Sequence, residues 1–82
     1  MPGVKHYLVV YDRSQGRLVS ITRFGSERRA EALRARFERE EAERANPNIE
    51  VNLLGAPSRK ALERTHARYF KSASRILSAA TS

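Results

Sequence analysis

The sequence contains no cysteine and no tryptophan among its 82 residues, and it has no long apolar run. Without cysteine there is no disulfide, no thiol nucleophile and no thiolate ligand, which excludes the disulfide-stapled class of small secreted domains. The first ten residues, MPGVKHYLVV, have neither a charged segment before a long apolar core nor a cleavage site. We therefore predict a cytoplasmic protein that does not enter a membrane.

Residues that form catalytic or metal centres are also scarce. The only histidines are His6 and His66, and neither has a histidine or an acidic residue at i+4, the spacing of helix-borne zinc sites. The serines stand at expected helix caps or in the tail, and no G-x-S-x-G frame is present. The paired carboxylates of Glu40 and Glu41 lie in a charge-balanced helix. We predict no enzymatic activity, no cofactor and no metal.

Positive charge is in excess, with 16 Lys and Arg against 9 Asp and Glu and a net charge of +7. The surplus lies at the two ends of the chain, because residues 26–45 carry equal numbers of acidic and basic groups. Such a field favours phosphate-rich partners, so DNA or RNA are candidate ligands. The bias toward arginine has two readings, bidentate anion recognition or GC-rich coding.

Three segments read as strands. Residues 5–12 (KHYLVVYD) are apolar on both alternating sides and suit a central strand, and residues 17–24 (RLVSITRF) form a hairpin with them through the turn that ends at Gly16. Residues 49–54 (IEVNLL) alternate as a third, half-covered strand. Gly55 is expected to stop this third strand.

Two segments read as helices. Ser26 is a candidate N-cap for residues 27–45, whose narrow apolar stripe is Ala30, Leu33 and Phe37. Ser58 is expected to cap a second helix that continues through residues 60–77. The prediction is a single α+β domain over residues 1–77 with ββαβα order, a three-stranded antiparallel sheet of order 2-1-3 packed on two helices, and a frayed tail at 78–82.

Placing both helices on one face of that sheet leaves the other face bare. Tyr7, Val9 and Tyr11 would then form an apolar surface, and a second copy of the chain is its simplest cover. We therefore expect a homodimer through these three residues. Stacking of nucleic-acid bases on the same aromatic rings is the alternative.

The second helix carries the main functional prediction. At 100° per residue, His66 and Tyr69 fall on its apolar face with Leu62, so His66 is expected to be a core residue whose ring nitrogens bond to a backbone group or to Tyr69. On the opposite face a cationic ridge forms, with no carboxylate among its members, which are Lys60, Arg64, Arg68, Lys71 and Arg75. The ridge could follow nucleic-acid phosphates, or it could merely keep a small basic protein soluble.

The loop before this helix is the other candidate site. Residues 53–60 (LLGAPSRK) pass from a strand through Gly55 to a helix start, where Ser58 and Arg59 could help to hold an anion. An ordinary strand-to-helix turn needs the same residues. We therefore predict a non-enzymatic module that binds nucleic-acid backbone through the ridge. The alternative is a homo-oligomeric assembly module, or one that engages an acidic protein partner.

Overall fold

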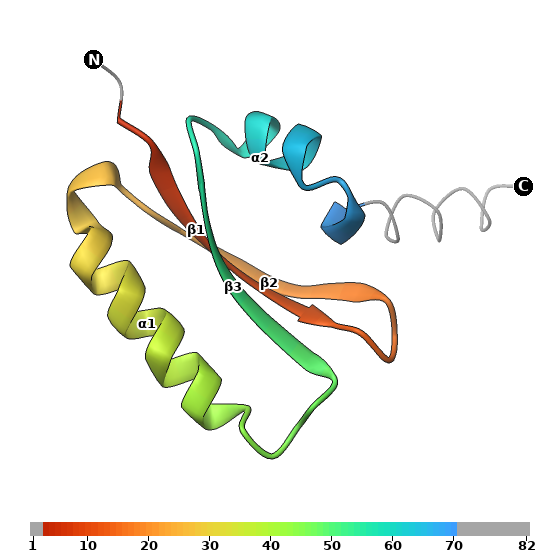
Figure 1. Cartoon of the computed structure of the whole chain (residues 1–82). Coiled ribbons are helices and arrows are strands. Elements are labelled where there is room, and N and C mark those ends of the chain that lie inside the picture. Colours follow the sequence, from red (N-terminus) through yellow and green to blue (C-terminus); the bar gives the residue numbers. More distant parts are fainter. Residues whose placement is uncertain (1–2, 71–82) are drawn as a thin grey trace, which may run out of the picture.

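The computed structural model describes residues 3–70, which form a small α+β domain with two helices and a three-stranded antiparallel sheet (Figure 1). The elements follow in the order β1 (Lys5–Asp12), β2 (Arg17–Phe24), a 3-10 turn (Ser26–Arg28), α1 (Arg29–Ala42), β3 (Ile49–Ala56) and α2 (Arg59–Thr65). The predicted fold class is confirmed. The predicted domain end at residue 77 and the tail 78–82 lie outside the described residues.

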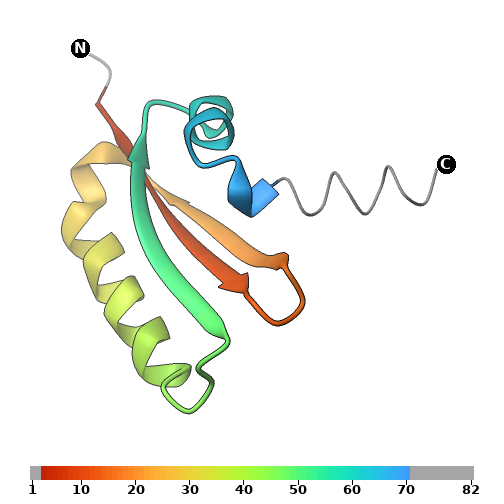
Figure 2. The same cartoon turned by 45° about the vertical axis from the view of Figure 1, so that its right-hand side comes forward.

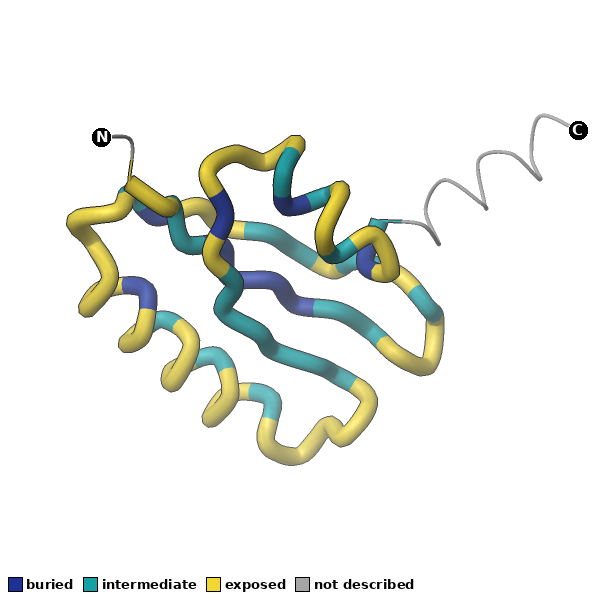
Figure 3. Tube along the Cα trace, turned by 45° about the horizontal axis from the view of Figure 1, so that its top comes forward, coloured by how far each residue is buried: buried dark blue, intermediate teal, exposed yellow. Residues whose placement is uncertain are grey.

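Strand β1 is the central strand, and the sheet order is β2-β1-β3 as predicted. It pairs antiparallel with both neighbours, so that Val9 lies opposite Ile21 of β2 and Asn52 of β3. Residues 7–10 of β1 are all buried, which Figure 3 shows as the dark stretch in the middle of the sheet. A strand that is apolar on both sides is most stable in this position, because cover is available for each face.

The β1–β2 hairpin is closed by the turn chemistry that the sequence indicates. The Asp12 carboxylate accepts hydrogen bonds from the backbone N–H groups of Ser14 at 2.9 Å and Gln15 at 3.2 Å. Gly16 takes the left-handed conformation with φ of 63°, where a side chain would be strained. Hydrogen bonds from Ser14 are the largest influence on Asp12, and the carboxyl pKa lies below its usual value.

The two helices cover opposite faces of the sheet, as Figure 2 shows, so the expectation that they share one face is wrong. On one face, Tyr7 and Val9 pack with Leu62 and Tyr69 from the C-terminal part of the chain. On the other face, Leu8 packs with residues of β2 and α1. Successive β-strand side chains point to opposite faces, so each apolar set of β1 has its own helix.

The predicted dimer interface is therefore filled within one chain. Tyr7 is 2% exposed and Val9 is 0% exposed, and both contact the segment that follows β3. Tyr11 is half-buried, and its ring lies edge-on to Tyr69 with 5.3 Å between centroids. The prediction of a homodimer through Tyr7, Val9 and Tyr11 is wrong, since these side chains already have their cover.

Helix α1 turns a different face to the sheet than its sequence indicates. Ala32 is fully buried against Leu8 and Phe24, and Ala35 packs beside it. The predicted stripe points to solvent instead, with Leu33 39% exposed and Phe37 63% exposed. Two alanines make the inner face because the sheet residues beneath them already fill the space, and small residues let the helix lie close.

The ends of α1 and β3 also differ from the prediction. Ser26 does not cap α1, because it lies in the 3-10 turn that precedes the helix. The N-cap residue of the 3-10 turn is Gly25 and that of α1 is Arg28, and neither makes a side-chain capping hydrogen bond. The helix ends at Ala42, short of the predicted residue 45, and residues 43–48 make the turn to β3. Strand β3 continues past Gly55 to Ala56, because both residues still pair with β1.

Candidate functional site

Helix α2 begins as predicted. The Ser58 Oγ accepts a hydrogen bond from the Ala61 N–H at 3.2 Å, which satisfies one of the free donors at the helix start. Lys5 Nζ donates to the Pro57 carbonyl oxygen at 3.3 Å. The oxygen of Ser58, a residue predicted as part of an anion site, therefore acts as the acceptor of the helix cap. Leu62 is the buried residue of this short helix and anchors it to the sheet.

The predicted long helix is interrupted soon after it begins. Helix α2 ends at Thr65, and His66 leaves the helical region with φ of −123° and ψ of 49°. Thr65 Oγ1 donates to the Ala61 carbonyl oxygen at 3.0 Å and lies 3.0 Å from His66 Nδ1. Residues 68–70 are helical again. His66 is half-buried beside Thr65, so its placement in the core with Tyr69 as partner is wrong.

The interruption divides the predicted cationic ridge. Lys60 and Arg64 lie exposed on α2, one turn apart, and within residues 3–70 neither forms an ion pair. Arg59 Nε pairs with Glu63 at 2.9 Å, and its guanidinium lies over the Phe70 ring. Arg68 turns back to the sheet. Lys71 and Arg75, the other predicted members, lie outside the described residues.

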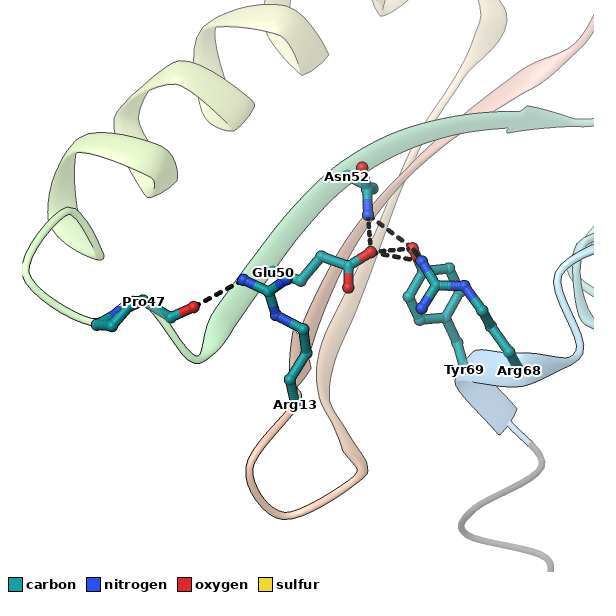
Figure 4. A network of polar contacts seen from close by, with 6 residues as sticks. All are labelled: Arg13, Pro47, Glu50, Asn52, Arg68 and Tyr69. Carbon is teal, nitrogen blue, oxygen red and sulfur yellow. Dashed lines mark hydrogen bonds and ion pairs between the residues drawn. The ribbon is translucent and has the colours of Figure 1, made fainter.

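Arg68 belongs to a polar cluster on β3, drawn in Figure 4, which consists of Glu50, Asn52, Arg68 and Tyr69. Glu50 Oε2 accepts hydrogen bonds from Arg68 Nη2 at 2.5 Å, the Tyr69 hydroxyl at 2.6 Å and Asn52 Nδ2 at 2.6 Å. Asn52 and Arg68 also donate to the Tyr69 oxygen, each at 2.6 Å. The cluster holds residues 68–70 on the sheet.

Charge and burial shift the acidity of the cluster. The hydrogen bond from Arg68 is the largest influence on Glu50 and holds its pKa below the usual value, with Tyr69 adding to the effect. Burial of the phenol, followed by its hydrogen bond to Glu50, raises the pKa of Tyr69 to about 12. At neutral pH the cluster therefore contains a carboxylate, a neutral phenol and a guanidinium.

The groups of this cluster satisfy one another's hydrogen bonds. Each shared atom is bonded to another protein group, and within residues 3–70 no buried side-chain nitrogen or oxygen is left without a partner. Sequence reasoning missed it. The available signal was the pair Glu50 and Asn52, which stand on one side of β3 and lie opposite Tyr11 and Val9 of β1.

The outer face of α1 is the more unusual surface. Ala30, Leu33 and Phe37, hereafter the α1 stripe, occupy consecutive turns and are all exposed. Phe37 lies about 140° around the helix from the buried Ala32, at 100° per residue. Figure 3 shows the same division, with the exposed side of α1 turned away from the sheet.

Charged side chains on the exposed surface of α1 are mostly separated by sign. Arg29 and Arg34 lie in its N-terminal half, where Glu31 is held by Arg28, Arg36 lies exposed near its middle, and Glu38, Glu40 and Glu41 lie in its C-terminal half. Within the chain Arg36 pairs with Glu40 at 3.6 Å, and Arg44 pairs with Glu41 at 2.5 Å. Arg29, Arg34 and Glu38 form no ion pair within the described part of the chain.

Membrane-spanning helices and metal centres are both lacking in the same part of the chain. Among residues 3–70, no helix is long and apolar enough to span a bilayer. Nor do three or more histidine, aspartate or glutamate side chains of this part gather as metal ligands would. A comparison of the whole chain with known protein families, curated proteins and solved structures found no match, so its surfaces are the guide to its function.

Proposed function

We propose that the protein is a non-enzymatic interaction module that associates with a protein partner through the α1 stripe. The observation that carries this proposal is the exposure of Phe37, at 63%, beside Leu33 at 39% on the same face of an ordered helix. Aromatic residues are enriched in protein interfaces, where they act as buried anchors. The lack of cysteine is consistent with a cytoplasmic setting, which we include in the proposal.

The stripe contributes little to the fold of a single chain. Ala32 and Ala35 already provide the contact of α1 with the sheet, and Phe37 points away from it. Phenylalanine is also a weaker helix former than alanine or glutamate, so helix propensity does not favour it at an exposed position. Single exposed apolar residues are common, but an adjacent pair continued by Ala30 forms a patch that association would bury.

We expect Phe37→Glu to abolish partner binding while the chain remains folded. The substitution places a charge where apolar contact is needed, but its effect on the free energy of unfolding is expected to stay within about 1 kcal/mol because the site is exposed. Chemical cross-linking followed by mass spectrometry measures which proteins bind the wild type and the variant in cell extract.

Ala42→Glu is the matched control, because it adds the same charge to α1 at an exposed position off the stripe. It should preserve every partner that the wild type captures. Equal capture by wild type and Phe37→Glu would mean that the stripe is not an interaction surface.

A second candidate function, binding of nucleic-acid phosphates, is supported by Lys60 and Arg64. These two side chains are exposed on one side of α2 and have no carboxylate partner among the described residues. They form a smaller footprint than the five-residue ridge, since Arg68 is held by Glu50 at 2.5 Å. Two phosphate contacts to a single strand give a slope of log K against log salt of about −1.4.

We expect Lys60→Ala/Arg64→Ala to remove most of any salt-dependent binding to labelled single-stranded DNA or RNA. The slope of log K against log salt should fall toward zero, because each lost phosphate contact to a single strand changes it by about 0.7. Arg36→Ala/Arg44→Ala removes the same charge from α1 and the turn that follows it, and is the control, as both residues are engaged by glutamates. If the two variants lose affinity equally, only net charge matters and no site exists on α2.

A further inference from the structure

We infer that the partner of the α1 stripe is a second copy of this chain, bound with the two α1 helices antiparallel. The inference rests on the proposed function, because it assigns an occupant to the same surface. A two-fold axis near the middle of α1 would place Leu33 of one copy against Phe37 of the other. Both exposed side chains, now 39% and 63% exposed, would be covered by the same contact.

Charge complementarity selects the second copy and its direction. The outer surface of α1 is mainly basic toward its N-terminus, at Arg29 and Arg34, and mainly acidic toward its C-terminus, at Glu38 and Glu41, while Glu31 and Arg36 are already held by Arg28 and Glu40. An antiparallel copy brings the basic half of one helix to the acidic half of the other, twice by symmetry. A parallel copy would bring like charges together along the whole contact. A different partner with a surface of uniform charge would be repelled by one half of α1, and repulsion of either kind suppresses binding.

Three of these charges are available for contacts between copies. Arg29, Arg34 and Glu38 have no ion-pair partner within the described chain, although Arg34 and Glu38 are one turn apart. The other outer glutamates hold Arg36 and Arg44, and the Arg44 side chain is 76% exposed. Pairs this exposed are weak and exchange readily, so they do not prevent a new contact.

The size of the stripe determines how strong this association is. It spans about two turns of one helix, which places the interface at the small end, below about 1,200 Å² of total buried area. Interfaces of this class are transient. We therefore expect self-association at about 100 µM and above, with monomers at about 1 µM, in sedimentation velocity experiments on the full chain at low salt.

Charge reversal tests the pairing. Arg29→Glu/Arg34→Glu gives the N-terminal half of the outer face the acidic charge of its C-terminal half, and Glu38→Arg/Glu40→Arg/Glu41→Arg gives the C-terminal half the basic charge of its N-terminal half. Each variant alone should associate at least tenfold more weakly than the wild type, because like charges then meet in every orientation. An equimolar mixture of the two variants should recover association as a heterodimer. Because both chains still carry their substitutions, this recovery would show that the loss in each variant alone comes from charge pairing and not from damage to the helix. Circular dichroism of each variant monitors the helix directly.

Cysteine cross-linking tests the direction, and the chain is suited to it because it has no cysteine of its own. In an antiparallel pair, residue 30 of one helix lies beside residue 40 of the other. Ala30→Cys mixed with Glu40→Cys should form a mixed disulfide under mild oxidation, and Ala30→Cys alone should form little. Efficient cross-linking of Ala30→Cys to itself would overturn the antiparallel arrangement.

The outcomes separate this inference from the proposed function. If the wild type stays monomeric at about 500 µM, yet captures another protein in a Phe37-dependent way, the second copy is overturned and the interaction surface remains. Self-association that persists unchanged in Phe37→Glu also overturns the inference. If neither self-association nor capture depends on Phe37, the proposed function fails as well.

Discussion

Leu62→Ala is expected to lower the free energy of unfolding by about 2 to 5 kcal/mol, the cost of a large cavity in a packed core. Leu62 is 0% exposed and packs with Tyr7, Val9 and Tyr69. It is the buried residue of α2, so its loss releases the helix from the sheet as well as creating a cavity. Urea unfolding measures the change, and the melting temperature should fall by about 10 °C or more.

Leu33→Ala is the matched control because it removes the same atoms from the other helix. Leu33 is 39% exposed and belongs to the α1 stripe, and alanine is the best helix former, so its cost should stay below about 1 kcal/mol. A Leu33→Ala variant as unstable as Leu62→Ala would show that the stripe belongs to the core. Leu33→Ala should nevertheless weaken association at high concentration.

The sheet was predictable because strand signals are local. Residues 5–12 are apolar on both sides, Gly16 suits the turn, and β3 alternates, so the order 2-1-3 follows from the crossover through α1. Which helix covers which face of the sheet could not be predicted from local signals. It depends on which apolar set of β1 each helix meets, and both sets, Tyr7 with Val9 and Leu8 with Val10, are equally apolar.

The inner face of α1 illustrates a second limit. Hydrophobicity favours Leu33 and Phe37 as the buried stripe, because they are the largest apolar residues of the helix. The structure buries Ala32 and partly buries Ala35 instead, beside Phe24, Val51 and other sheet residues that fill the core. Volume rather than hydrophobicity decides the outcome, and the volume available is a property of the packed sheet that the helix sequence does not contain.

The candidate sites were predictable only in part, because a helical wheel assumes an unbroken helix. Lys60 and Arg64 are exposed on one side of α2 as the wheel predicts. Beyond Thr65 the wheel fails, because His66 leaves the helical region and Arg68 finds Glu50, eighteen residues earlier in the chain. A contact between distant residues of this kind overrides local periodicity.

Tyr69 is the side chain with which we expect the largest polar effect on stability. Tyr69→Ala should cost about 3 to 5 kcal/mol, the usual range for a buried aromatic residue, since the ring is 2% exposed. Tyr69→Phe keeps the ring and removes only the hydroxyl, to which Asn52 and Arg68 donate and which itself donates to Glu50. Its cost should be about 1 to 3 kcal/mol, because three partners lose a bond.

The pH dependence of unfolding distinguishes the hydroxyl from the ring. The folded pKa of Tyr69 is raised to about 12 from an ordinary value of 10.0, so its stabilising contribution is complete below pH 10 and is lost as the pH rises toward 12. The contribution of Glu50 depends on pH in the opposite direction. Its folded pKa is lowered, so its contribution is present above the ordinary value of 4.5 and is lost as the pH falls through the folded pKa.

We therefore expect the stability difference between wild type and Tyr69→Phe to shrink between about pH 10 and pH 12, measured by urea unfolding at each pH. The stability difference between wild type and Glu50→Gln should shrink on the acid side, as the pH falls through the lowered pKa of Glu50. Comparing each variant with the wild type cancels the titration of lysines, which both chains share. If these stability differences stay constant across both the acid and the alkaline range, the hydrogen bond between Glu50 and Tyr69 does not depend on their charge states. Packing of the Tyr69 ring alone would then hold residues 68–70 on the sheet.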